Sequence, residues 1–103
     1  LKQLQSVTLN LRSNSIGDEG CTALAEVLRH SPKLTTMNLH LDDNQINNTG
    51  CLVWAVHLRE MQHLTSMRVS FRGNKEISGE AWAVWLEAVG NLRWLRNVTL
   101  VSL

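Results

Sequence analysis

Residues 4–21 read LQSVTLNLRSNSIGDEGC. The same order of apolar and polar positions returns at 34–51 as LTTMNLHLDDNQINNTGC and at 64–82 as LTSMRVSFRGNKEISGEAW. A shortened copy, LRNVTLVSL, fills 95–103. The leucines that open the four copies stand 30, 30 and 31 residues apart, and the extra residue in the third interval is Glu76. A fixed period of this length indicates tandem structural units.

Each unit is predicted to begin with a short strand and a polar turn. In the first copy Val7, Leu9 and Leu11 alternate with polar residues, the spacing of a strand with one buried face. The matching positions of the next two copies are also apolar: Met37, Leu39, Leu41, Met67, Val69 and Phe71. An asparagine follows each triplet, at Asn14, Asn44 and Asn74. We expect these amides to be buried in the turns, where they can satisfy backbone groups that no strand partner reaches.

A change of period after each turn predicts a helix. Cys21, Leu24, Ala25 and Leu28 fall at positions i, i+3, i+4 and i+7, one face of an amphipathic helix. The same face returns in the later copies as Cys51, Trp54, Ala55 and Leu58, and as Trp82, Trp85, Leu86 and Val89. Asp18 and Asn48 are the predicted N-caps of the first and second helices. Pro32 and Gly90 are typical of the ends of the first and third helices.

A strand, an asparagine turn and a helix within about 30 residues resemble the leucine-rich repeat. Residues 9–20, LNLRSNSIGDEG, resemble its ribonuclease-inhibitor-like subtype. The resemblance covers nearly the whole chain. It implies an α/β fold: a horseshoe-shaped solenoid segment with a parallel sheet on its concave side and helices on its convex side. It also implies a single domain over 1–103, with repeats at about 4–33, 34–63 and 64–94 and a partial repeat at 95–103.

The two ends of the predicted array do not resemble caps. Terminal repeats normally present a polar outer face, yet Leu4, Val7 and Leu9 lie near the start of the chain and Leu100 near its end. In the partial repeat Ser102 takes the place of an inward leucine. We therefore expect a segment of a longer solenoid, or a stack whose ends contact flanking repeats or other subunits.

The composition is that of one soluble globular domain. The chain has 103 residues, of which 44% are hydrophobic and 18% charged, with a formal net charge of +1. A charge this small argues against nucleic acid and against an anionic membrane as the main partner. The sequence shows no signal peptide, and we interpret the sequons at Asn47 and Asn97 as coincidence. We predict an intracellular, cytoplasmic location.

The residues with reactive side chains do not form a catalytic or metal-binding motif. Cys21 and Cys51 occupy equivalent positions of successive copies, here called a column, on the inward helix face. We expect two small buried hydrophobes rather than a disulfide. The four histidines lack the spacing of a zinc site. The sequence contains no Gly-x-Ser-x-Gly motif and no phosphate-cradling glycine loop. The prediction is a non-catalytic chain without metal or cofactor.

The candidate binding surface is the concave face of the sheet. Equivalent outward residues of parallel strands stand about 4.8 Å apart and form ladders along that face. The predicted partner-binding residues are Asn38, His40, Arg68, Ser70, Arg72, Arg12 and Asp42. Arginine side chains favour carboxylates, so this surface would fit an acidic patch on a partner protein. The alternative is a solvated face that binds nothing.

Trp94 is a separate candidate. It follows Lys33 and His63 in its column, both of them polar, which makes it the tryptophan most open to solvent. An exposed indole is a typical interface anchor, although packing beneath the loop is an equal alternative.

The leading functional hypothesis is a protein-interaction or scaffold module. The first alternative is a structural subunit of a larger assembly, with both ends of the solenoid covered by other chains. The second is a GTPase-activating regulator resembling the activating protein of Ran, with Arg12 or Arg72 as its arginine. This last alternative depends on fold analogy alone.

Overall fold

A computed structural model describes residues 2–101 of the chain, and strands alternate with helices along it. The strands are β1 (Ser6–Asn10), β2 (Thr36–His40), β3 (Ser66–Ser70) and β4 (Asn97–Val101). The helices are α1 (Gly17–Arg29), α2 (Asn48–Leu58) and α3 (Gly79–Gly90). The predicted α/β class and the predicted order of elements are confirmed. The predicted irregularity at Ser102 lies outside the described residues.

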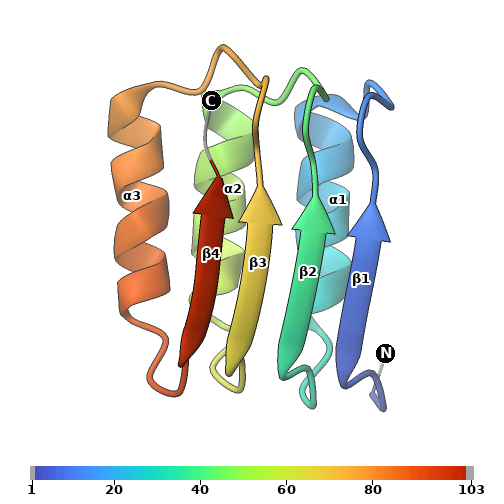
Figure 1. The fold of residues 1–103 in the computed structure, drawn as a ribbon, viewed down its shortest axis with the longest axis vertical. Coiled ribbons are helices and arrows are strands. Elements are labelled where there is room, and N and C mark those ends of the chain that lie inside the picture. The colour runs from blue at the N-terminus through green and yellow to red at the C-terminus, as the bar shows by residue number, and fades with distance from the viewer. Residues whose placement is uncertain (1, 102–103) are drawn as a thin grey trace.

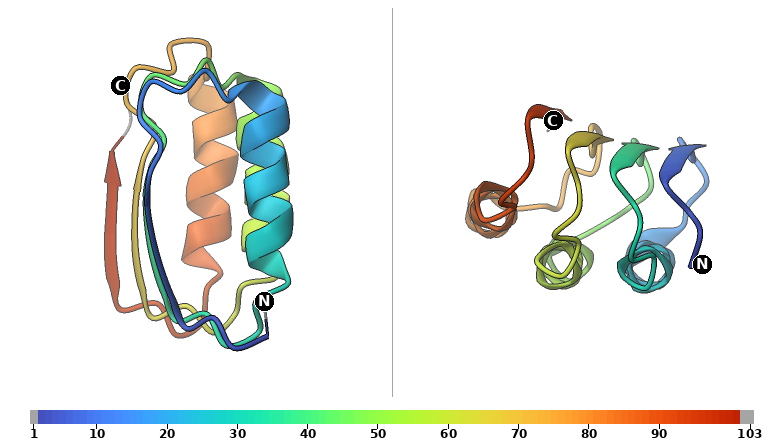
Figure 2. Two further views of the ribbon diagram at one scale, coloured as in Figure 1. Left: turned by 90° about the vertical axis from the view of Figure 1, so that its right-hand side faces the viewer. Right: turned by 90° about the horizontal axis from the view of Figure 1, so that it is seen from below.

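The four strands form one parallel sheet in the order β1-β2-β3-β4 (Figure 1). Equivalent residues of successive copies pair with one another: Thr8 with Asn38, Asn38 with Arg68, and Arg68 with Thr99. The helices lie in one layer on one side of the sheet, and the other side, here called the open face, is uncovered (Figure 2). The period-two alternation therefore sends alternate side chains toward the helices and onto the open face.

The hydrophobic core lies between the sheet and the helix layer, and it is most complete in the middle of the stack. Leu39 and Leu41 of the second copy are fully buried, whereas their counterparts Leu9 and Leu11 in the first copy are only half-buried. The apolar side chains of each copy are therefore buried partly by the copies on either side.

The tryptophans thicken this core toward the C-terminus. Trp54 and Trp85 are fully buried, as predicted. Trp82 stacks on Trp85 with ring centroids 5.5 Å apart and planes 7° from parallel. Phe71 meets Trp85 edge-on at 5.5 Å, an arrangement that the quadrupoles of the two rings favour.

Helix α3 turns the predicted face toward the core, with one exception. Leu86 was expected in the core, yet it is 43% exposed, while Ala81 and Ala88 are buried. The residues matching Leu86 in α1 and α2 are Ala25 and Ala55, which are buried because another helix packs against each of those helices. Within residues 2–101 no helix follows α3, so the matching position is open.

The asparagine column joins neighbouring copies. Asn74 is buried, and its Oδ1 accepts hydrogen bonds from the backbone N–H groups of Asn44, at 3.0 Å, and Ile46, at 2.9 Å. Its Nδ2 donates to the carbonyls of Leu41 and Phe71, each at 2.8 Å. Asn44 makes the same kinds of contact with the first copy.

The predicted burial of this column is wrong at its first member. Asn14 is exposed, and its side chain makes one hydrogen bond, from Nδ2 to the carbonyl of Arg12 at 3.1 Å. Asn44 and Asn74 are buried because each turn rests on the turn of the preceding copy. Asn14 belongs to the first copy, so its amide has no preceding turn to bind among the described residues.

The predicted helix caps are also wrong. Ile16 is the N-cap of α1, and Asp18 lies within that helix. The Oδ1 atom of Asp18 instead accepts from the backbone N–H groups of Asn47, at 2.7 Å, and Gly50, at 3.0 Å, at the start of α2. Asn48 is the first residue of α2, and its Oδ1 accepts from the Ser78 N–H at 2.7 Å, at the start of α3. Each side chain therefore supports the next helix, because adjacent helices start side by side.

Candidate functional site

The open face is built from the outward side chains of the four strands. Arg68 extends from the centre of β3 and is exposed, with Asn38 and Thr99 beside it on the neighbouring strands. Thr8 at the far end of this ladder is exposed as well. The ladder presents hydroxyl, amide and guanidinium groups, all of which can hydrogen-bond a partner.

Arg12 is held in place near one end of the open face. Its Nε lies 3.6 Å from Oδ2 of Asp42, and its Nη2 lies 3.3 Å from Nδ1 of His40. Charges of neighbouring copies thus pair on this face at Arg12 and Asp42. Arg72 is exposed at the matching position of the third copy.

Two predicted contact residues offer little surface. Ser70 is only 5% exposed and Asp42 only 8%. Ser70 is a short side chain between His40 and Val101 in the strand register, and these longer neighbours shield it. Asp42 is covered because Arg12 pairs with it. A partner on the open face would meet Asn38, His40, Arg68, Arg72 and Arg12 instead.

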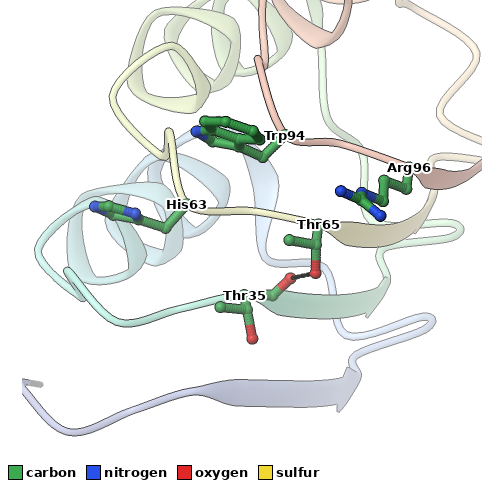
Figure 3. Close-up of a pocket in the computed structure, with 5 residues that line it drawn as sticks. All are labelled: Thr35, His63, Thr65, Trp94 and Arg96. Carbon is green, nitrogen blue, oxygen red and sulfur yellow. Dashed lines mark hydrogen bonds between the residues drawn. The ribbon is translucent and has the colours of Figure 1, made fainter.

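Trp94 lies away from the open face, at the edge of the sheet where the strands begin. Its side chain is 53% exposed and lines an open pocket of 480 Å³ together with Thr35, His63, Thr65 and Arg96 (Figure 3). The backbone N–H of Arg96 donates to the carbonyl of Thr65 at 2.9 Å, and Oγ1 of Thr65 donates to the carbonyl of Thr35 at 3.3 Å. These bonds hold the three residues side by side.

The sequence contains a signal for this pocket beyond Trp94. His63 and Trp94 occupy one column of the repeat, and Thr35, Thr65 and Arg96 occupy the column two residues later. Stacking of the copies brings the members of each column together. The two columns, taken together, therefore indicate the residues that line the pocket.

A charged cluster joins the outer sides of α1 and α2. Nη2 of Arg29 lies 2.9 Å from Oε1 of Glu26, and its Nη1 lies 3.2 Å from Oε2 of Glu60. Nε2 of His57 lies 3.1 Å from Oε2 of Glu26. Hydrogen bonds from the Arg29 side chain lower the pKa of Glu26 from 4.5 to about 2. The repeat pattern gives no signal for this cluster, because its members occupy different columns.

The reactive side chains are in unreactive surroundings. Cys21 and Cys51 are buried and free, which confirms the prediction of two small buried residues without a disulfide. Burial raises the pKa of the Cys21 thiol far above its ordinary value and that of Cys51 to about 11. Both thiols therefore stay protonated at neutral pH, the weakly nucleophilic form. Across residues 2–101, no cluster of three or more His, Cys, Asp or Glu side chains could hold a metal ion.

Comparison with known proteins gives one match. A family model described as "Leucine Rich repeat" matches residues 3–25, which cover β1, its turn and the first half of α1. No curated protein and no solved structure matches the chain. The match supports a leucine-rich repeat protein, a class of domain that generally mediates protein interactions. None of the helices between residues 2 and 101 has the length and hydropathy needed to cross a bilayer.

Proposed function

We propose that this chain is a non-catalytic protein-interaction or scaffold module. In this proposal it is a solenoid segment of ribonuclease-inhibitor-like leucine-rich repeats, a single domain over 1–103 with repeats at about 4–33, 34–63, 64–94 and 95–103. The observation that carries the proposal is the open face, a polar parallel sheet that no helix covers (Figure 2). The inner strands β2 and β3 are paired on both sides within the sheet, so a partner on the open face would meet side chains rather than backbone.

The chemistry of the open face favours a protein with carboxylates on its surface. Arg68 and Arg72 are exposed, and each guanidinium can bind one carboxylate through two parallel hydrogen bonds. Arg12 is already paired with Asp42, so it contributes less. The two free buried cysteines support an intracellular setting, where thiols stay reduced.

The apolar ends of the stack favour a second role, as a structural subunit with both ends covered. Val27 on α1 is 48% exposed, Leu86 on α3 is 43% exposed and Val98 on β4 is 48% exposed. The residue matching Val27 in α3 is Ala88, which is fully buried against the rest of the stack. These end surfaces would be covered by flanking repeats or by other subunits. The GTPase-activating alternative stays a prediction and depends on the resemblance alone.

Affinity capture with a charge-reversal variant tests the open face. The wild-type chain, Arg68→Glu and Lys75→Glu would be immobilised and exposed to the same cell extract, with the retained proteins compared quantitatively. Lys75 is exposed in the loop before α3, so its reversal makes the same change in net charge off the sheet. We expect Arg68→Glu to lose proteins that the wild type and Lys75→Glu retain. Equal retention by all three chains would contradict the proposal.

A further inference from the structure

The small net charge of the chain hides a separation of charge between the two loop edges of the sheet. The edge where helices end and strands begin, here called the basic edge, carries six cationic residues: Lys2, Arg29, Lys33, Arg59, Arg93 and Arg96. Among the described residues two carboxylates, Glu26 and Glu60, pair with a cation of this edge, and both pair with Arg29. The remaining five cationic side chains are exposed and make no salt bridge within residues 2–101.

The opposite edge has the reverse character. Its loops and helix starts carry six carboxylates: Asp18, Glu19, Asp42, Asp43, Glu76 and Glu80. Arg12, Arg72 and Lys75 are the cations of that edge. An approaching anionic partner is therefore attracted to one edge and repelled by the other, so its orientation is set before contact.

The Trp94 pocket lies within the basic edge and gives this edge a concave site. The exposed indole of Trp94 and the side chain of Arg96 line the same hollow, and the Thr65 hydroxyl points away from both toward the carbonyl of Thr35 (Figure 3). An indole face accepts a flat or apolar side chain, and a guanidinium accepts a carboxylate. One ligand with both kinds of group would use the whole pocket.

We infer that the basic edge binds an extended acidic segment of a partner protein, with an apolar side chain on Trp94 and carboxylates on Arg96 and its cationic neighbours. The inference rests on the proposed function and names the chemistry of a partner. Four strands spaced about 4.8 Å apart give an edge of about 14 Å, the length of about four residues of extended chain. A single-stranded nucleic acid would bind through a row of stacked aromatics, and this edge exposes one indole.

Fluorescence anisotropy with a defined peptide tests the inference directly. The probe is a fluorescein-labelled peptide of sequence Glu-Asp-Phe-Glu-Asp-Glu, and the comparison probes are its amide counterpart, Gln-Asn-Phe-Gln-Asn-Gln, and an oligothymidine of equal charge. The full chain would be titrated as wild type, Arg96→Glu, Trp94→Ala and Lys75→Glu. Both edge side chains are exposed and make no side-chain hydrogen bond in the described structure, so these variants should fold; circular dichroism checks this.

We expect the acidic peptide to bind the wild type and Lys75→Glu alike, and the amide peptide at least about tenfold more weakly. Arg96→Glu and Trp94→Ala should each weaken binding of the acidic peptide by about tenfold, the usual effect of losing a central contact. The inference is overturned by any of three results: equal binding of acidic and amide peptides, tighter binding of oligothymidine, or equal losses in Lys75→Glu and Arg96→Glu. Arg68→Glu distinguishes the basic edge from the open face. Because Arg68 lies on the open face, this variant should bind the acidic peptide as tightly as the wild type does, whether or not the open face binds a partner.

Discussion

Asn74 shows how a single side chain can connect two copies of the repeat. Its amide makes four hydrogen bonds to backbone groups, one to the end of the strand in its own copy and three to the preceding copy. The strand at this point has ended, so these backbone groups have no ladder partner. Buried groups of this kind are costly when left unpaired, which explains why an asparagine recurs at this offset.

Replacing Asn74 by alanine should destabilise the chain by about 3 kcal/mol, because it leaves four buried backbone groups without their side-chain partner. Asn14→Ala is the matched control, since Asn14 is the same residue in the same column but is exposed and makes one side-chain hydrogen bond. Its cost should stay below about 1 kcal/mol. Urea unfolding of the two variants measures the difference, and equal costs would show that the turns are not joined by this column.

At the scale of the element, helices are fixed by side chains of the preceding helix. Asp18 extends from α1 and accepts hydrogen bonds from two backbone N–H groups at the start of α2. Asn48 makes a similar bond from α2 to the start of α3. The free N–H groups of a helix start thus find acceptors one copy away.

Asp18→Ala should therefore destabilise α2 rather than α1, at a cost of about 1 kcal/mol. Asp18→Asn should keep most of the stability, because an amide oxygen serves the same purpose at Asn48. Hydrogen exchange at the backbone of Asn47 and Gly50 reports the effect locally. Faster exchange confined to the start of α1 would contradict this account. Glu19→Ala, an exposed acidic neighbour, is the control.

The cluster on α1 and α2 predicts a dependence of stability on pH. The pKa of Glu26 is lowered to about 2 in the folded chain by its hydrogen bonds with Arg29, so the ionised form stabilises the fold. This contribution is complete above the unfolded pKa of 4.5 and is lost as the pH falls from there to about 2. Glu26→Gln should be less stable than the wild type at pH 7 and should lose less stability across that range.

Urea unfolding at a series of pH values from 7 to 2 measures this effect. Glu87→Gln is the matched control, because Glu87 occupies the same column in α3 and makes no salt bridge within residues 2–101. Parallel stability profiles for the wild type and Glu26→Gln would show that the cluster does not stabilise the helix pair.

The elements themselves could be predicted from the sequence, because period and offset are properties of one copy. Strands such as β1 and the burial of Trp54 follow directly from the apolar columns. The partners of Asp18 could not be predicted, since spacing along a chain does not say which neighbouring helix start lies beside a side chain. Leu86 was misplaced for a related reason: its burial depends on a following helix, which no pattern within the copy reveals.

At the scale of the whole molecule, the stack is apolar at both ends and carries opposite charge at its two loop edges. Trp94 could be singled out from its column, but the basic edge could not be found from a net charge of +1. The net charge adds together cations and carboxylates that the fold places at opposite edges of the sheet. The arrangement of the copies decides where the charges gather.

The apolar ends predict that the chain associates with itself as its concentration rises. Leu86→Lys should weaken this association, because it places a charge on an exposed end of the stack. Val56→Lys is the control: Val56 is 57% exposed on α2, in the same column as Glu26 and Glu87. Sedimentation velocity over a range of concentrations measures the effect. A monomer at all concentrations with a high unfolding temperature would contradict end-on contact.

The proposal that a partner protein binds the open face is tested most directly by site-specific photo-crosslinking. A photoreactive phenylalanine would replace Thr99, the exposed neighbour of Arg68 on the open face, in one chain and Val56 on the helix layer in another, and both would be irradiated in the same cell extract. We predict crosslinked protein from the Thr99 position and none from Val56. Crosslinks from Val56 alone would contradict binding through the open face.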